Sequence, residues 1–339
     1  GQREWLHRAF SRRHNKVRCM SASPDIAILL DHFGSGGVER VACHVANGLA
    51  KRGFRVEFVV TRAQGPTLRL LASAVTVQSL DLPPKNSRDS RMRSAIPALA
   101  EYLKERAPRL FHAPGNHTIR PAAAAVKLAG YAGPFVAKVT NPILDERLTW
   151  FERRWRRLSF GRALRQAERI LVLSEAGVGE VAQLDPSLRE RTGVVHNPYV
   201  HNGMVARAIE RQPSSPPVIL SVGRLHQQKN QALLLRAVAR LKDRNWRLRL
   251  CGTGPDEATL RTLSQELSIA DRVEFAGFIA DPVPEYLAAT VLAQSSRWEG
   301  LPATVLEAIA CGCPVVATAS SPALVDLLRE VGGREPVVV

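Results

Sequence analysis

Two glutamates in the C-terminal third of the chain, Glu299 and Glu307, lie eight positions apart across the start of a predicted helix. Pro302 has the fixed φ that suits a first helical position, and Gly312 is placed for a left-handed cap at the helix end. We therefore expect Glu299 in a loop and Glu307 about two turns inside the helix. The unpaired backbone amides of residues 300–304 would stand at the positive helix end, where anions bind.

The surroundings of Glu307 bear on its role. Its neighbours Leu306, Ala308 and Ile309 are apolar, and a carboxylate buried among such residues is costly unless it has a partner. The alternative is structural: Glu299 complements the helix dipole, and Glu307 is a solvated surface charge. The apolar neighbours favour a buried carboxylate that needs a partner.

Two cations follow an apolar run, residues 218–222, that is predicted to be a buried strand. Gly223 and Arg224 come directly after the run, and Lys229 follows five residues later. Arg224 offers a planar fork of donors and Lys229 a point charge, a combination that suits a diphosphate. Either residue alone would be read as a surface cation at a helix start.

The motifs together resemble a known family. Glu299 begins the pattern Glu-Gly-Leu-Pro-x4-Glu, which is followed by Ala-x-Ala-x-Gly-x-Pro-Val-Val-Ala. This resembles the retaining, two-domain (GT-B) nucleotide-sugar glycosyltransferases of family 4. Gly-Arg-x4-Lys at 223–229 and Gly-Gly-x-Glu-Arg at 36–40 are similar to motifs of the same family.

The resemblance implies roles for single residues. Arg224 and Lys229 would hold the donor diphosphate and stabilise its charge as the sugar leaves. Glu299 would meet hydroxyl groups of the donor sugar, and with the two cations it completes the implied catalytic set. Glu307 would accept hydrogen bonds from the ribose.

Further donor-binding residues are implied in both halves of the chain. Gly36 and Gly37 would close over the sugar phosphate, and Phe278 lies in the loop that corresponds to base recognition. Asn141 stands where many relatives carry a histidine that contacts the donor sugar. An amide can hydrogen-bond there but cannot carry a positive charge. The phosphate end would be lined by Gly300, Leu301 and Pro302.

The chain contains no Asp-x-Asp motif to hold a metal ion. The cations and helix amides would then neutralise the leaving diphosphate, which predicts a metal-independent enzyme. No cofactor is expected beyond the nucleoside-diphosphate sugar, which is a co-substrate. The family's retention of configuration is described as front-face attack, and the sequence offers no obvious enzyme nucleophile.

The length of 339 residues suits two domains, and strands alternate with helices through both halves. We predict an α/β protein with two Rossmann-like, doubly wound parallel-sheet domains that face each other across a cleft. The predicted segments are a basic tail at 1–23, an acceptor-binding domain at 24–210, a linker at 211–217 and a nucleotide-sugar-binding domain at 218–339. We interpret residues 82–92 as a mobile loop.

The end of the chain departs from the family. The family's Gly-Gly-x-x-Glu after the last core strand is replaced by a segment that begins at Ser320. The chain stops at Val339, before the helices that usually cross back to the first domain. Either the second domain is incomplete or its closure is altered.

Composition limits the location of the protein. No run approaches the ~20 apolar residues that span a bilayer, and the first twenty residues lack the apolar centre of a secretory signal. The five cysteines show no CxxC spacing, which argues against zinc. A reducing cytoplasm fits, with the protein either soluble or peripheral on the inner membrane face.

Charge is concentrated in the first half. Residues 1–200 hold 32 Lys and Arg against 17 Asp and Glu, whereas residues 201–339 hold 15 against 14. Helix 150–166 carries several arginines interleaved with aromatic residues, which is typical of a surface that docks on anionic membrane. A solvated helix face is the alternative. Nucleic acid is not expected, because no recognition motif accompanies the charge.

The expected function is transfer of a hexosyl-type sugar from a nucleoside-diphosphate sugar to a glycan or lipid-linked acceptor, in cell-surface polysaccharide or glycolipid synthesis. A catalytically impaired sugar-nucleotide or membrane-binding module is the alternative, to which Asn141 and the altered tail point. A nicotinamide-dependent oxidoreductase is disfavoured, because the glycine loop at 34–39 lacks the third glycine of Gly-x-Gly-x-x-Gly.

Overall fold

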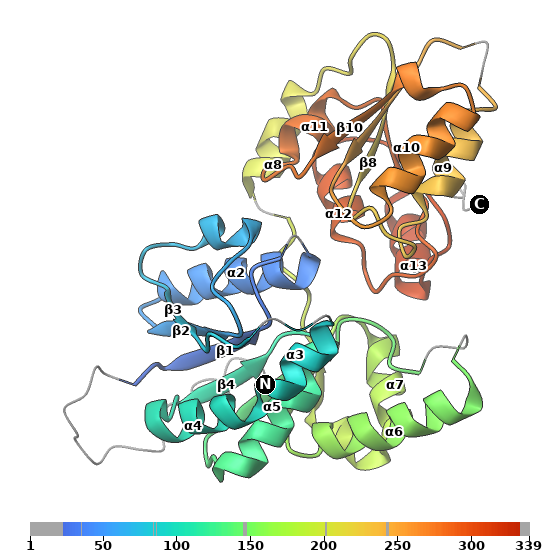
Figure 1. Ribbon diagram of the computed structural model, residues 1–339. Helices are drawn as coiled ribbons and strands as arrows, with labels where there is room; N and C mark the ends of the chain where they lie inside the picture. The colour runs from blue at the N-terminus through green and yellow to red at the C-terminus, as the bar shows by residue number, and fades with distance from the viewer. Residues whose placement is uncertain are drawn as a thin grey trace. The chain divides into compact units, whose positions relative to one another are not determined.

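The computed structural model describes residues 23–34, 36–83, 85, 87–144, 148–200, 202–241 and 244–332. The chain forms two compact units, Gly1–Asn197 and Pro198–Val339 (Figure 1). Residues 1–22 of the predicted basic tail lie outside the described part.

The first unit is built on a seven-stranded parallel sheet with the order β3-β2-β1-β4-β5-β6-β7. Strand β1 is buried along its whole length, as the uninterrupted apolar run predicts for a strand covered on both faces. The chain order reverses between β1 and β4, which makes this sheet doubly wound. The strands are β1 (Ile26–Leu30), β2 (Val56–Val60), β3 (Thr76–Ser79), β4 (Leu110–Ala113), β5 (Phe135–Lys138), β6 (Arg169–Val172) and β7 (Thr192–Val194).

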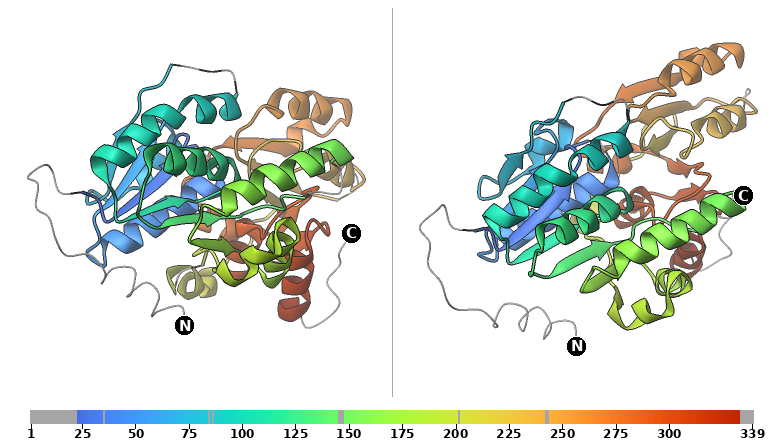
Figure 2. Two further views of the ribbon diagram at one scale, coloured as in Figure 1. Left: turned by 90° about the horizontal axis from the view of Figure 1, so that it is seen from below. Right: turned by 60° about the horizontal axis from the view of Figure 1, so that its bottom comes forward.

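Helices cover both faces of this sheet. Helix α2 packs on one face with the side chains of Ile26, Ile28 and Leu30, while α4, α5, α6 and α7 share a second core with Ala27 and Leu29. Within this layer α4 contacts α5 and α5 contacts α6, and the three run side by side over the sheet (Figure 2). The helices are α2 (Gly37–Ala50), α3 (Arg88–Ser94), α4 (Ile96–Arg106), α5 (Asn116–Ala129), α6 (Trp150–Leu164) and α7 (Glu175–Leu184), with 3-10 turns at Pro66–Leu70 and Pro186–Arg191.

Helix α3 corrects one prediction, because the segment 82–92 was expected to be a loop and its second half is helical. Ser87 caps the helix through a hydrogen bond that its Oγ accepts from Ser90 N at 3.2 Å. Asp89 complements the first turn and Met92 is buried in the core. A serine cap followed by an acidic residue was the signal, and the neighbouring prolines obscured it.

The second unit is built on a five-stranded parallel sheet with the order β10-β9-β8-β11-β12, which is also doubly wound. Its strands are β8 (Val218–Val222), β9 (Arg247–Cys251), β10 (Val273–Gly277), β11 (Val291–Gln294) and β12 (Val315–Ala317). Its helices are α8 (Asn202–Arg207), α9 (Gln231–Val238), α10 (Glu257–Glu266), α11 (Val283–Ala288), α12 (Ala303–Ala310) and α13 (Pro322–Gly332), with 3-10 turns at Ala208–Glu210 and Ala270–Arg272.

Two cores flank the second sheet. Helices α9 and α10 pack on one face, and α11, α12 and α13 pack on the other. Met204 of α8 belongs to the second of these cores, and Arg211 Nη2 donates to the carbonyl oxygens of Ala289 at 2.7 Å and Thr290 at 3.2 Å. The chain from α8 onward is therefore attached to the second unit, upstream of the predicted boundary after residue 210.

Candidate functional site

The candidate site lies at the switch point of the second sheet. Strand β8 pairs with β11, and the helices that follow them, α9 and α12, pack on opposite faces. The two connecting loops, residues 223–230 and 295–302, therefore leave the carboxyl edge side by side in opposite directions. Such a divergence is where doubly wound sheets bind ligands.

Glu299 is the centre of this site. Its side chain is buried, and its Oε1 accepts hydrogen bonds from Lys229 Nζ at 2.6 Å, Ser296 Oγ at 2.7 Å and Gln294 Nε2 at 3.2 Å. Lys229 supplies the opposite charge that a buried carboxylate requires. Thr304 of α12 completes the network, because its Oγ1 donates to Gln294 Oε1 at 3.1 Å.

Two residues predicted to be catalytic are thus in direct contact, although the sequence did not predict their ion pair. The backbone also fastens the two loops together. Ser295 Oγ donates to Lys229 O at 2.9 Å, Arg297 N donates to Gln228 O at 2.8 Å, and Gln228 Nε2 donates to Trp298 O at 3.0 Å. Lys229 is therefore held at both its backbone and its side chain.

Arg224 lies on the same loop as Lys229 but is exposed. Its backbone is fixed by Gln231 Nε2, which donates to Arg224 O at 2.9 Å. The loop after β9 packs directly against this segment: a Cβ at Gly252 would lie 1.9 Å from Gly223 O, and a Cβ at Gly254 would lie 2.1 Å from Leu225 O. Only glycine fits at either position. The two glycines are visible in the sequence, but nothing there indicates that they pack against residues 223–225.

Glu307 is 2% exposed and projects from α12 into the core of the second unit. Tyr286 of α11, fully buried, donates its hydroxyl to Glu307 Oε2 at 2.9 Å. This phenol is the partner that the apolar neighbours of Glu307 required. Gly312 has a φ of 70°, which confirms the predicted left-handed cap. Pro302 was expected at the first helical position and instead has the extended conformation of an N-cap, so that Ala303 begins the helix.

The remaining predicted donor residues of the second unit lie near the same sheet edge. Gly300 O accepts a hydrogen bond from Ser321 Oγ at 2.6 Å, and Leu301 and Pro302 lead from there into α12. Phe278 directly follows β10, whose last residue, Gly277, accepts a hydrogen bond from Gly252 N at 2.7 Å. The loop that is predicted to recognise the base therefore adjoins the loop that supports Arg224.

Ser320, which stands in the altered segment, is a residue that sequence reasoning did not assign to the site. Its carbonyl oxygen accepts from Glu299 N at 3.0 Å, so that it helps to fix the Glu299 backbone. Its Oγ is buried and has no hydrogen-bond partner among the described residues. The departure from the family pattern thus places a buried, unsatisfied hydroxyl on a residue whose carbonyl oxygen binds the Glu299 backbone.

In the first unit, Gly36 and Gly37 lie where β1 leads into α2. Gly36 is the N-cap of this helix, and a Cβ there would lie 2.3 Å from Glu39 Oε2, so the buried Glu39 carboxylate lies against it. Gly37 has no atom within 4 Å of a Cβ position. Ser35, between Gly34 and these residues, lies outside the described part.

Asn141 follows β5 and its side chain is exposed. Its backbone is held by Asn116 at the start of α5, because Asn116 Nδ2 donates to Asn141 O at 2.8 Å and Asn116 Oδ1 accepts from Thr140 N at 2.8 Å. Nearby, Lys138 at the end of β5 donates to Asn197 Oδ1, and burial lowers the pKa of Lys138 to about 8. The Asn141 carboxamide is therefore exposed at the carboxyl edge of the first sheet.

Asp31, directly after β1, is a buried charge that sequence analysis missed. It accepts from Arg91 Nη2 at 2.6 Å and Nε at 3.0 Å, and from Thr61 Oγ1 at 2.8 Å. Burial alone would raise the pKa of Asp31, but the hydrogen bonds from His32, Arg91 and Thr61 and the charge of Arg91 bring it well below its usual range. Asp31 therefore ties α3 to the edge of the sheet.

Two searches of the described residues complete the survey. No group of three or more His, Cys, Asp or Glu side chains in this part of the chain is arranged to hold a metal ion. No described helix has the length and apolar character needed to cross a membrane.

These features define a class: an α/β protein of two Rossmann-like units, with a charged site at the switch point of the second sheet, as nucleotide-binding enzymes have. Comparison with known families agrees. Residues 35–201 match the family described as Glycosyltransferase Family 4, and residues 205–331 match Glycosyl transferases group 1. The chain belongs to this GT-B glycosyltransferase family, which confirms the resemblance.

Individual relatives point the same way. An uncharacterized glycosyltransferase of Haemophilus influenzae is 28% identical over 90% of this chain and 83% of its own length. The lipopolysaccharide core biosynthesis glycosyltransferase LpsE of Rhizobium meliloti is 27% identical over 85% of this chain and 78% of its own. Among solved structures, Anabaena HepE in complex with UDP and glucose shares the fold, with a TM-score of 0.69 at 22% identity, covering 89% of this chain and 82% of that one.

Proposed function

We propose that the protein is a retaining glycosyltransferase that moves a hexosyl-type sugar from a nucleoside-diphosphate sugar to a glycan or lipid-linked acceptor. The observation that carries the proposal is the Lys229–Glu299 ion pair at the switch point of the second sheet. Family membership supports sugar transfer, and the similarity to LpsE supports a role in cell-surface polysaccharide or glycolipid synthesis.

The contacts in the site suggest a separate role for each charged residue. Arg224 and Lys229 neutralise the diphosphate as it leaves, with Glu299 fixing the ammonium group of Lys229 in position. Because Glu299 Oε1 already accepts three hydrogen bonds, Glu299 is suited to orienting donor hydroxyls rather than to nucleophilic attack. Glu307, oriented by Tyr286, receives the ribose hydroxyls.

A donor screen tests the proposal. We expect one of the UDP-, GDP- and ADP-sugars to raise the melting temperature, since a ligand at ~100 times its dissociation constant adds ~2.7 kcal/mol of stability. Turnover with that donor should continue in EDTA, as expected of a metal-independent enzyme without a further cofactor. Loss of turnover in EDTA with recovery in manganese would contradict metal independence, and absence of any stabilising sugar nucleotide would contradict the function.

The alternative is a catalytically impaired sugar-nucleotide or membrane-binding module. Asn141 favours it, because the exposed amide replaces a histidine and cannot supply positive charge to the donor sugar. The donor screen separates the two functions: an impaired module would be stabilised by a sugar nucleotide yet would neither transfer nor hydrolyse it.

The acceptor is proposed to be reached from the cytoplasmic face of an anionic membrane, on which α6 would dock. On this helix Trp150, Phe151 and Trp155 are exposed to 66%, 77% and 57%, and the neighbouring Arg153 and Arg154 are exposed as well. Aromatic and arginine side chains on one exposed helix favour the membrane interface. The predicted contribution of the tail falls on residues outside the described part.

A further inference from the structure

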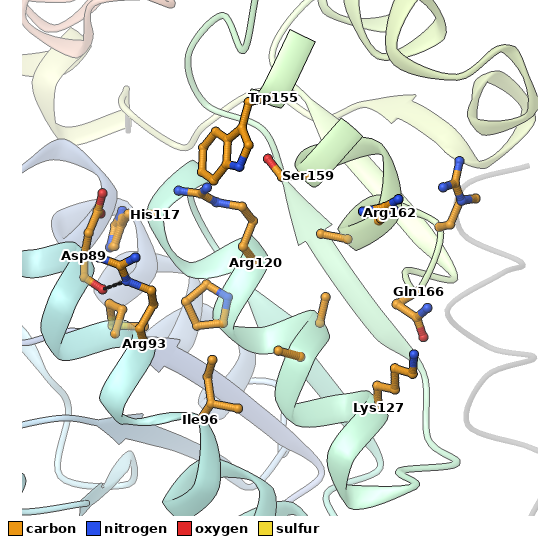
Figure 3. Close-up of a pocket in the computed structure, with 16 residues that line it drawn as sticks. Asp89, Arg93, Ile96, His117, Arg120, Lys127, Trp155, Ser159, Arg162 and Gln166 are labelled. Carbon is orange, nitrogen blue, oxygen red and sulfur yellow. Dashed lines mark hydrogen bonds between the residues drawn. The ribbon is translucent and has the colours of Figure 1, made fainter. Parts of the chain in front are cut away.

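A groove of about 610 Å³ lies within the first unit, between α3, α5 and α6 (Figure 3). At the start of α5 it reaches His117, which directly follows Asn116, the residue that holds the Asn141 backbone. Its apolar lining comes from all three helices and the start of α4. The apolar residues are Met92, Ile96, Pro121, Ala123, Ala124 and Ala163. A ligand that fills the groove must therefore cover hydrocarbon surface.

Cations surround this apolar lining. The positively charged residues of the groove are Arg93, Arg120, Lys127, Arg162 and Arg165, against a single carboxylate, Asp89. Arg165 is paired with Asp185 at 2.6 Å. Of the groove's cations, Arg165 alone has an ion pair among the described residues, so the groove retains a net positive charge that an anion would neutralise.

Arg120 and His117 are the two groove residues that an anion would contact. The Arg120 guanidinium lies 4.6 Å from the centroid of the Trp155 ring and 5.1 Å from that of Phe160, so two aromatic rings hold it in the middle of the groove. His117 Nε2 is buried and has no hydrogen-bond partner among the described residues. The Arg120 guanidinium therefore offers donors to an anionic group, and the ring of His117, one turn earlier on α5, lines the same groove.

We propose that this groove binds the phosphate head group and first chain segment of a lipid phosphate. The phosphate would accept hydrogen bonds from Arg120 and His117, and the chain would cover the apolar lining. A free inorganic anion would leave that lining exposed, and an uncharged sugar would leave the cations uncompensated. This binding does not depend on the sugar-transfer chemistry proposed above.

Calorimetry with dodecyl phosphate, kept below its micelle concentration, tests the proposal. We expect saturable binding of one molecule per chain. Inorganic phosphate, which lacks the tail, and dodecyl maltoside, which lacks the charge, should each bind at least ~10-fold more weakly, a loss that corresponds to ~1.4 kcal/mol. Equal binding of inorganic phosphate would indicate a soluble anion, and equal binding of dodecyl maltoside a detergent surface; either result would overturn the proposal.

Three variants locate the site. Arg120→Gln should weaken dodecyl phosphate binding ~10-fold or more, and Arg162→Gln, at an exposed rim residue, should weaken it severalfold while the melting temperature stays unchanged. Arg189→Gln removes the same charge from an exposed residue outside the groove and should change nothing. Equal affinity in all three would refute the site. No sugar nucleotide is present, so this result stands apart from the donor screen.

Discussion

Lys229 and Glu299 are 70 residues apart in the sequence and form an ion pair at 2.6 Å. Sequence motifs identified both residues but assigned them to different parts of the donor, because a motif specifies a residue and not the direction of its side chain. The supporting groups were not predictable either. Gln294 and Ser296 belong to a strand end and its loop, where polar residues are common, and only the fold directs them at Glu299.

Substitution of the two cations separates catalysis from stability. Arg224→Ala and Lys229→Ala should each slow turnover ~100-fold or more, because each would remove a donor that we propose binds the leaving diphosphate. Only Lys229→Ala should also lower the melting temperature, since it leaves the buried Glu299 carboxylate without its cation. The measurements are steady-state kinetics and thermal melts.

The matched control is the double variant Lys229→Ala with Glu299→Gln. The glutamine amide at position 299 is uncharged and needs no cation beside it. The melting temperature of the double variant should therefore recover, while its turnover stays low. Near-normal turnover of a folded single variant would show that the substituted cation does not belong to the site.

Asp31 gives the first unit a predictable acid sensitivity. Its folded pKa lies below the unfolded value of ~3.9, so its contribution to stability is complete above that value and is lost as the pH falls toward the folded pKa. Asp31→Asn should therefore lower the free energy of unfolding at pH ~6, by an amount that shrinks below pH ~4. Urea unfolding across this range is the measurement. Asp271→Asn, at an exposed residue of the second unit, should show no such trend.

At the scale of elements, apolar runs and glycines predicted the order of strands and helices well. The run at 218–222 became β8, and Gly312 forms the left-handed cap of α12 as expected, whereas Pro302 precedes the first helical residue instead of being it. The prediction failed where local signals conflict, as in α3, where prolines precede a serine cap. It also could not pair elements: nothing in the sequence near Glu307 indicates that the hydroxyl of Tyr286 in α11 lies 2.9 Å away.

The close approach of two loops in the second unit can be tested by adding one methyl group. Gly254→Ala would place its Cβ 2.1 Å from Leu225 O, so the segment that carries Arg224 must shift. We expect weaker donor binding and slower turnover. Gly179→Ala is the matched control, because no atom lies within 4 Å of its Cβ position in α7, and it should add ~0.5–1 kcal/mol of helix stability. Normal donor affinity in Gly254→Ala would contradict the supporting role of this loop.

At the scale of the whole molecule, two doubly wound sheets were predictable because each βα repeat has its own strand and helix signals. The boundary between the two units was less predictable. Polar and proline-rich residues at 211–217 suggested a linker, whereas the compact units divide between Asn197 and Pro198. Which unit a short segment joins depends on packing, such as that of Met204 in the second core, and this cannot be read from composition.

The uneven charge of the chain predicts salt-sensitive binding to anionic liposomes. Each basic residue near such a surface contributes ~1 kcal/mol, and the attraction fades within a Debye length. Glutamine at Arg153, Arg154, Arg156 and Arg157 of α6 should therefore reduce the liposome binding that is seen at low salt. Salt-insensitive binding, or none at low salt, would identify α6 as a solvated face and indicate a soluble acceptor.

Parallel pairing at the switch points has a consequence for folding. Strand β11 pairs with β8 in a register that joins Val291 to Ile219, so the intervening chain must be closed into a long loop before the two strands meet. Loop closure of this kind slows folding. Lys229 and Glu299 meet only after that closure, so we expect recovery of donor binding to lag behind the recovery of helical circular dichroism when the denatured protein is refolded.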